Sequence, residues 1–231
     1  MKYNYEFKKY DCKYAPSFFF RYILALPEDY KEGEKLPMIV FLHGAGERGD
    51  NIEDVLGYGL PKTMVEYGLN ARVIFLAPQI ADPTHVWNIH AIETFELINH
   101  IADKYNADED KISLTGISMG GYGTWELGML YKGYFSALAP ICAGGMSWRA
   151  TELVGTPIRT FHGDADDIVP ITASREMVDY IKKVGGDAEF IILHDVDHHS
   201  WDFAYEQTNL VEWLVKQDRK DHPHIEPIRL F

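Results

Sequence analysis

A serine between glycines, a group of aspartates and a group of histidines are the residues of this chain that could do chemistry together. Residues 116–120 read Gly-Ile-Ser-Met-Gly, a G-x-S-x-G pattern centred on Ser118. Further along the chain, aspartates stand at 164, 166 and 167, and histidines stand at 194, 198 and 199. A serine hydroxyl is a weak nucleophile unless a histidine takes its proton and a carboxylate orients that histidine. The order serine, acid, histidine therefore favours acyl transfer by a nucleophilic serine.

For these residues to meet, secondary structure must bring their loops to one place. Predicted strands cover 3–14, 17–26, 37–43, 72–78, 111–115, 135–141, 157–162 and 188–194. Predicted helices cover about 52–67, 91–105, 119–131, 177–184 and 203–215. The alternation predicts an α/β protein with a doubly wound, mostly parallel, eight-stranded sheet and antiparallel edge strands within residues 1–26.

The serine, the aspartates and the histidines each follow a predicted strand. In doubly wound sheets, ligands bind beyond the carboxyl ends of the strands, so the three groups are expected at one edge. The strand 111–115 leads into Ser118, and a helix follows, which is the setting of a nucleophile elbow. The pattern does not choose among the three aspartates or among the three histidines, although His194 still continues the strand pattern.

A second glycine-rich loop, HGAGERG at 43–49, follows the first buried strand. A loop in this position donates one backbone N–H to an oxyanion, and the residue after the nucleophile donates another. We therefore expect the oxyanion hole to consist of the backbone N–H groups of Ala45 and Met119. We also expect Gly46 to adjoin the substrate, while Glu47 and Arg48 either clamp a substrate group or brace their own loop.

Tryptophans at 87, 148 and 201 fall in predicted loops near the same sheet edge. An indole ring can stack on a sugar or an aromatic acyl group, and it can equally anchor a loop to the core. We expect Trp87 and Trp201 to contact the substrate.

The histidines and aspartates at 194–199 are also possible metal ligands. Their spacing matches no metal motif, and the serine–acid–histidine order explains their position better. We therefore expect neither a metal nor a cofactor. The sequence leaves the roles of Asp167, Asp197 and His199 undefined.

The composition of the 231 residues fits one globular domain over 1–231, with a tail at 220–231. Lysine plus arginine total 22 and aspartate plus glutamate total 35, so the formal charge is 22 − 35 = −13. This charge argues against binding to nucleic acid or to an anionic membrane. The expected partner is a small molecule, and the sequence does not predict the oligomeric state.

The first residues, MKYNYEFKKYDCKY, are polar and do not resemble a signal peptide. Cys12 and Cys142 are isolated and fit two reduced core residues in a reducing compartment, with a disulfide between them as the alternative. We expect a cytoplasmic protein, the alternative being a secreted form that has already been processed.

Several segments resemble the α/β-hydrolase superfamily, and more narrowly the small bacterial esterases called phospholipase/carboxylesterase-like, carbohydrate esterase family 1-like or prolyl-oligopeptidase-like. The resembling segments are FLHGAGERGDN at 41–51, LAPQ at 76–79, KISLTGISMGGYGTWELGMLY at 111–131, FSALAPICAGG at 135–145, HGDADDIVP at 162–170 and DHHSW at 197–201.

The resemblance implies a triad of Ser118, Asp166 and His198 acting on esters. Two positions depart from the family pattern: Asp167 stands where proline is usual, and Asp197 stands where glycine is usual. The connection 142–156, where this family commonly inserts a lid, is too short for a large lid domain. The expected activity is a serine esterase that cleaves acylated carbohydrates or small aryl or alkyl esters through an acyl-enzyme. The alternative is a thioesterase, lysophospholipase or peptidase that uses the same triad.

Overall fold

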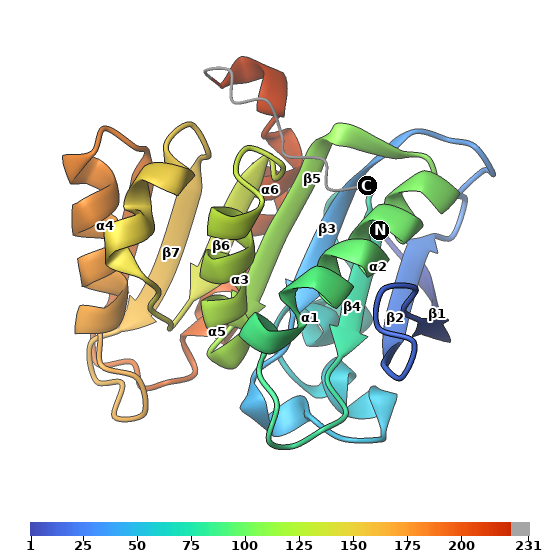
Figure 1. The fold of residues 1–231 in the computed structure, drawn as a ribbon, viewed down its shortest axis with the longest axis horizontal. Helices are drawn as coiled ribbons and strands as arrows, with labels where there is room; N and C mark the ends of the chain where they lie inside the picture. Colours follow the sequence, from blue (N-terminus) through green and yellow to red (C-terminus); the bar gives the residue numbers. More distant parts are fainter. Residues whose placement is uncertain (223–231) are drawn as a thin grey trace.

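Eight strands form one sheet in the computed structural model, which describes residues 1–222 (Figure 1). The strands are β1 Tyr3–Asp11, β2 Phe19–Pro27, β3 Leu36–Leu42, β4 Ile74–Gln79, β5 Ala107–Ile117, β6 Ala137–Ile141, β7 Ile158–Gly163 and β8 Ala188–Leu193. Their order across the sheet is β1-β2-β4-β3-β5-β6-β7-β8. This is the α/β-hydrolase topology, and the predicted fold class is confirmed.

The direction of the strands follows from the connections between them. A short turn joins β1 to β2, so these two strands pair antiparallel, with Tyr3 opposite Pro27 and Asp11 opposite Phe19. Strand β2 also pairs antiparallel with β4, whereas all pairs from β4 to β8 are parallel because helices connect them. Every residue of β4 and β6 is buried, as their continuous apolar sequences predict for strands covered on both faces.

Helices cover both faces of the sheet. They are α1 Gly59–Tyr67, α2 Ala91–Lys104, α3 Met119–Leu130, α4 Thr172–Lys183, α5 Ser200–Glu206 and α6 Leu210–Lys216. One apolar core contains side chains of α2, α3 and α4, and the other contains side chains of α1, α5 and α6. Figure 1 shows the first set of helices in front of the sheet and the second set behind it.

Two predicted helices are each interrupted. The segment 52–67 is a 3₁₀ helix, Ile52–Gly57, followed by α1, and the change of direction falls at Gly59, whose φ is +60°. The last predicted helix divides into α5 and α6 at Thr208. The hydroxyl of Thr208 donates to the carbonyl of Ala204 (2.6 Å) and accepts from the N–H of Leu210 (3.1 Å), so one side chain ends the first helix and begins the second.

The connection from β6 to β7 contains only the short 3₁₀ helix Ser147–Leu153, so no large lid is present there. Cys12 and Cys142 are both buried and unpaired. Within residues 1–222, no helix has the length and apolar content needed to cross a bilayer. From residue 223 onwards, the predicted tail at 220–231 lies outside the described residues.

Candidate active site

Three side chains at the carboxyl edge of the sheet form a continuous hydrogen-bonded chain. The Oγ atom of Ser118 lies 2.9 Å from Nε2 of His198, and Nδ1 of the same ring lies 2.7 Å from Oδ2 of Asp166. Ser118 is partly exposed, His198 has a side chain that is 12% exposed, and the Asp166 side chain is fully buried. When Nδ1–H donates to the carboxylate, the ring presents the lone pair of Nε2 to a hydroxyl that solvent can reach.

Ser118 occupies a sharp turn between β5 and α3, with φ +50° and ψ −116°. Small neighbours are required because the chain packs closely here. A Cβ on Gly116 would lie 2.4 Å from the carbonyl oxygen of Gly120, and one on Gly120 would lie 1.9 Å from the carbonyl oxygen of Leu42. The G-x-S-x-G pattern therefore reflects the space available at a strained strand-to-helix turn.

Asp166 is held by backbone groups of its own loop. Its Oδ1 atom accepts hydrogen bonds from the N–H groups of Ile168 (2.9 Å) and Val169 (2.8 Å), which leaves Oδ2 directed at His198. This loop lies against the loop that carries His198, because a Cβ on Gly163 would approach the carbonyl oxygen of Val196 to 2.1 Å. The two loops can approach this closely only with glycine at 163.

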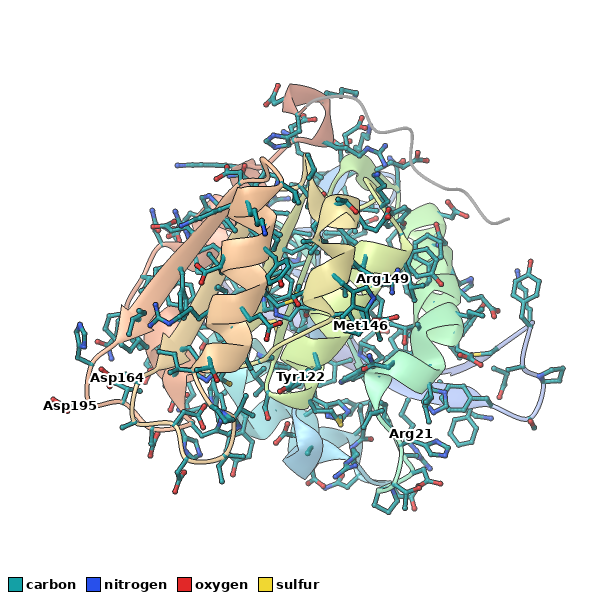
Figure 2. The ribbon with its side chains drawn as sticks, turned by 60° about the vertical axis from the view of Figure 1, so that its left-hand side comes forward. Arg21, Tyr122, Met146, Arg149, Asp164 and Asp195 are labelled. Carbon is teal, nitrogen blue, oxygen red and sulfur yellow. The ribbon has the colours of Figure 1, made fainter. Side chains whose placement is uncertain are left out.

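The other candidate aspartates and histidines point elsewhere. Asp164 accepts from Nδ1 of His194 (2.8 Å) and from the N–H of Asp195 (2.8 Å), and the His194 side chain is 84% exposed. The hydrogen bond from His194 lowers the pKa of Asp164. Figure 2 shows Asp164 and Asp195 at the margin of the molecule. Asp167 is exposed, so of the three aspartates only Asp166 reaches His198.

Asp197 forms its hydrogen bond with His199, the residue after His198. Its Oδ1 atom accepts from the backbone N–H of His199 at 2.9 Å, and this bond lowers the pKa of Asp197. The ring that packs against His198 is Trp201, edge-to-face at a centroid distance of 5.4 Å. Trp201 is only 5% exposed, which leaves little of its surface for the expected contact with a substrate.

Both predicted oxyanion donors begin a helical turn, where backbone N–H groups have no partner within the helix. Ala45 is the first residue of the 3₁₀ helix Ala45–Glu47, and Met119 is the first residue of α3. Gly46 is exposed, and a Cβ placed on it would meet no atom within 4 Å.

Glu47 and Arg48 brace the loop, which was one of the two interpretations of this pair. The buried carboxylate of Glu47 accepts from the N–H of Gly44 (2.7 Å), and burial raises the pKa of Glu47. Arg48 donates from Nε to the carbonyl of Ala45 (2.9 Å) and from Nη1 to the carbonyl of His85 (3.1 Å).

Two buried residues, Trp87 and His43, form hydrogen bonds at the start of the 43–49 loop. The indole Nε1 of Trp87 donates to the carbonyl of His43 (2.9 Å), and the Trp87 side chain is fully buried. This burial corrects the expectation that Trp87 contacts a substrate, because no part of the ring reaches the surface. Nε2 of His43 accepts from the N–H of Ile80 (3.0 Å), and burial lowers the pKa of His43 to about 4. His43 was assigned no role from the sequence. A histidine directly after a continuous apolar run indicates a buried ring that needs hydrogen-bond partners, and this was the available sequence signal.

Among residues 1–222, one group of side chains has the types and spacing to hold a metal ion: Cys142, Asp166 and His198, whose potential ligand atoms lie within 4.8 Å of one another. Two of these residues already bond to each other. Burial raises the pKa of the Cys142 thiol to about 12, and only a thiolate is a good ligand. This donor set therefore fits a hydrogen-bonded chain better than a metal site.

Residues 89–209, just over half of the chain, match the phospholipase/carboxylesterase family. Among solved structures, a thermostable esterase is 30% identical, with a TM-score of 0.80; the match covers 93% of this chain and 63% of that one. The chain therefore spans less than two thirds of that esterase.

Two more distant structures share the fold. The feruloyl esterase module from Clostridium thermocellum is 13% identical, with a TM-score of 0.74 over 97% of this chain and 92% of that one. The acylaminoacyl peptidase of Pyrococcus horikoshii is 17% identical, with a TM-score of 0.70 over 98% of this chain and 43% of that one. No curated protein sequence matches the chain significantly.

Proposed function

The chain belongs to the phospholipase/carboxylesterase family of the α/β-hydrolases, and we propose that it is a serine hydrolase that cleaves carboxylic esters. The observation that carries the proposal is the chain of hydrogen bonds from the Ser118 hydroxyl through His198 to the Asp166 carboxylate, at 2.9 and 2.7 Å. These are the distances at which a histidine acts as general base towards a serine.

In the acylation half of the reaction, Nε2 of His198 takes the Ser118 proton while Oγ attacks the acyl carbon of the ester. The resulting oxyanion accepts hydrogen bonds from the backbone N–H groups of Ala45 and Met119. His198 then gives its proton to the alkoxy oxygen, the C–O bond to the alcohol breaks, and an acyl-enzyme on Ser118 is left. Throughout, Asp166 stabilises the imidazolium.

In the deacylation half, His198 takes a proton from a water molecule, and the hydroxide attacks the acyl carbon. The tetrahedral intermediate collapses to the carboxylic acid, and His198 returns its proton to Oγ of Ser118. Water and ester are consumed, acid and alcohol are formed, and the enzyme returns to its starting state.

For the substrate, we propose acylated carbohydrates or small aryl and alkyl esters. Two exposed apolar side chains adjoin the triad in sequence: Tyr122, 37% exposed and one helical turn after Ser118, and Ile168, 67% exposed and two residues after Asp166. Figure 2 shows Tyr122 at the end of α3 that carries Ser118. An aromatic or aliphatic group of an ester would gain apolar contact on these side chains. The fold shared with a feruloyl esterase module makes feruloylated sugars worth testing.

The test has two parts. A fluorophosphonate probe should label the protein at Ser118, as mapped by mass spectrometry, and Ser118→Ala should abolish labelling and lower kcat by about 10⁶-fold, the order found for other triads. A panel of nitrophenyl esters, acetylated and feruloylated sugars, thioesters and peptide anilides then ranks substrates by kcat/KM. Esters should rank first. If thioesters or anilides rank first, the alternative acyl-transfer activities replace this proposal, and absence of an adduct on Ser118 rejects it.

A further inference from the structure

A second histidine approaches the Asp166 carboxylate from within the protein. Nε2 of His162 lies 3.1 Å from Oδ2 of Asp166, the same oxygen that faces His198 at 2.7 Å. His162 is the last but one residue of β7 and is fully buried, so its position is set by the sheet. Unlike His198, it has no path to a substrate, and the mechanism above does not use it.

The protonation of Nε2 follows from its neighbours. It lies 2.8 Å from the carbonyl oxygen of Val169 as well as 3.1 Å from the carboxylate, and both of these groups can only accept. Nε2 must therefore carry a hydrogen, whether the ring is neutral or charged. On the other side of the ring, Nδ1 lies 2.7 Å from Oγ of Ser174, and this hydroxyl also lies 2.7 Å from the carbonyl oxygen of Ala143. The hydroxyl has one hydrogen: if it donates to Ala143, Nδ1 also carries a hydrogen and the ring is charged, and if it donates to Nδ1, the ring is neutral. Nε2 carries a hydrogen in both cases.

With this hydrogen counted, four N–H groups face the carboxylate of Asp166. Three of them donate hydrogen bonds to it, and the fourth, Nε2–H of His162, donates to the carbonyl of Val169 (2.8 Å) and lies 3.1 Å from Oδ2 in an ion-pair contact. Backbone N–H groups of Ile168 and Val169 reach Oδ1, and the two histidines reach Oδ2. Two N–H groups that face the same oxygen restrict rotation of the carboxylate about its Cβ–Cγ bond. The orientation of Asp166 then sets the orientation and tautomer of His198.

Resting on the proposed function, we propose that His162 is a positioning residue of the triad: its Nε2–H holds Oδ2 of Asp166 in line with Nδ1 of His198. We attribute this role to the N–H group at Nε2, and not to the burial of an imidazole ring in general. It therefore predicts that a side chain with a donor at the Nε2 position replaces His162, and that an apolar side chain of similar size does not.

The experiment compares three variants. His162→Leu removes the donor and keeps the volume, His162→Gln restores an N–H donor near Nε2, and Thr160→Val is the matched control. Thr160 lies on the same strand, is fully buried and donates one hydrogen bond to the carbonyl of Pro140 (2.6 Å), remote from Asp166 in the hydrogen-bond network. We expect His162→Leu to lower kcat about 10- to 100-fold, the order of one hydrogen bond to a charged group, with KM nearly unchanged. His162→Gln should recover most of kcat, and Thr160→Val should retain wild-type kcat.

A double-mutant cycle separates this role from a general structural one. In the Asp166→Ala background, His162→Leu should cause no further loss of kcat, because the hydrogen bond it removes no longer has its acceptor. Equal losses in the two backgrounds, or equal losses from His162→Leu and Thr160→Val, would overturn the proposal.

A measurement on the wild-type imidazole keeps the proposal testable if the His162 variants do not fold. The ¹⁵N NMR spectrum should show His162 protonated at Nε2, and the shift of that nitrogen should change in Asp166→Ala but not in Thr160→Val. A bare Nε2 contradicts the proposal. A wild-type protein that neither hydrolyses esters nor labels at Ser118 is a failure of the proposed function, whereas an active wild type matched by His162→Leu is a failure of the positioning role alone.

Discussion

The buried carboxylate of Glu47 accepts a hydrogen bond from the backbone N–H of Gly44, three residues earlier in the same loop, at 2.7 Å. This bond closes the turn that presents the N–H of Ala45, a predicted oxyanion donor. In Glu47→Ala the Gly44 N–H would lose its partner while buried, which costs about 1–3 kcal/mol. We expect a lower Tm and a lower kcat in Glu47→Ala, and smaller losses in Glu47→Gln, which keeps an acceptor oxygen. Equal losses in the two variants, measured by thermal melts and ester kinetics, would show that the carboxylate charge matters more than the bond.

Asp166 and its neighbour Asp167 provide a test of the acid. Asp166→Asn changes the partner of His198 Nδ1 and should lower kcat by about 10⁴-fold, the size of the same change in another serine triad. Asp167 is exposed, so Asp167→Asn should change kcat less than threefold, within about 0.7 kcal/mol of barrier. Steady-state kinetics on one nitrophenyl ester checks both variants, and a reversed ranking means that the wrong acid is assigned.

Gly120 is required by the space at the elbow. In Gly120→Ala the new Cβ would lie 1.9 Å from the carbonyl oxygen of Leu42, so the start of α3 must move away from β3. We expect Gly120→Ala to lower the free energy of unfolding by at least about 1–3 kcal/mol, the usual cost of an overpacked core position. Gly57→Ala is the control, because a Cβ there meets no atom within 4 Å. In urea unfolding, the midpoint of Gly120→Ala should lie well below that of Gly57→Ala. Similar midpoints would contradict the packing argument.

His43 makes stability depend on pH. Its pKa is lowered by burial from 6.5 to about 4, so the unfolded chain binds more protons than the folded one between these values. The free energy of unfolding is therefore highest, as far as His43 is concerned, above pH 6.5. It falls by up to about 3 kcal/mol as the pH is lowered from 6.5 towards 4. Urea unfolding at pH 7, 6, 5 and 4.5 measures the slope. His43→Gln should be less stable than the wild type at pH 7 and show a shallower slope, and an unchanged slope would contradict this account of His43.

Removal of metal ions should leave activity unchanged. The group that could hold an ion contains Asp166 and His198, which bond to each other, and a Cys142 thiol whose pKa is raised to about 12 by burial. Ester hydrolysis should therefore be the same before and after dialysis against EDTA. A loss of activity that Zn²⁺ restores would show that the donor set binds a metal after all.

The sequence predicted the sheet well because its central strands are buried on both faces. Continuous apolar runs such as 37–43 and 72–78 can only be accommodated inside, and they correspond to β3 and β4. Helix boundaries were less predictable. The interruption at Thr208 depends on two hydrogen bonds of one hydroxyl, which the apolar periodicity of 203–215 does not reveal.

The tryptophans show a different limit. A loop tryptophan that anchors and one that binds a ligand have the same local sequence, so the choice depends on what covers the ring. Trp87 is covered completely and Trp201 almost completely; Trp87 bonds to the carbonyl of His43, and Trp201 packs against the ring of His198. In the same way, nothing near His162 in sequence indicated that its ring would reach Asp166.

By itself, the sequence determined the fold class, the strand that carries Ser118 and the loops that must supply the acid and the base, because hydrophobic runs and glycine positions are local properties. Tertiary structure decided which acid and which base meet the serine. Asp164 and His194 are separated by 30 residues and Asp166 and His198 by 32, and each pair is hydrogen-bonded. Spacing therefore does not distinguish them. Only the second pair reaches Ser118, at 2.9 Å from Nε2 of His198, whereas the His194 side chain of the first pair is 84% exposed. The difference depends on how the loops after β7 and β8 pack against each other, which is a tertiary property.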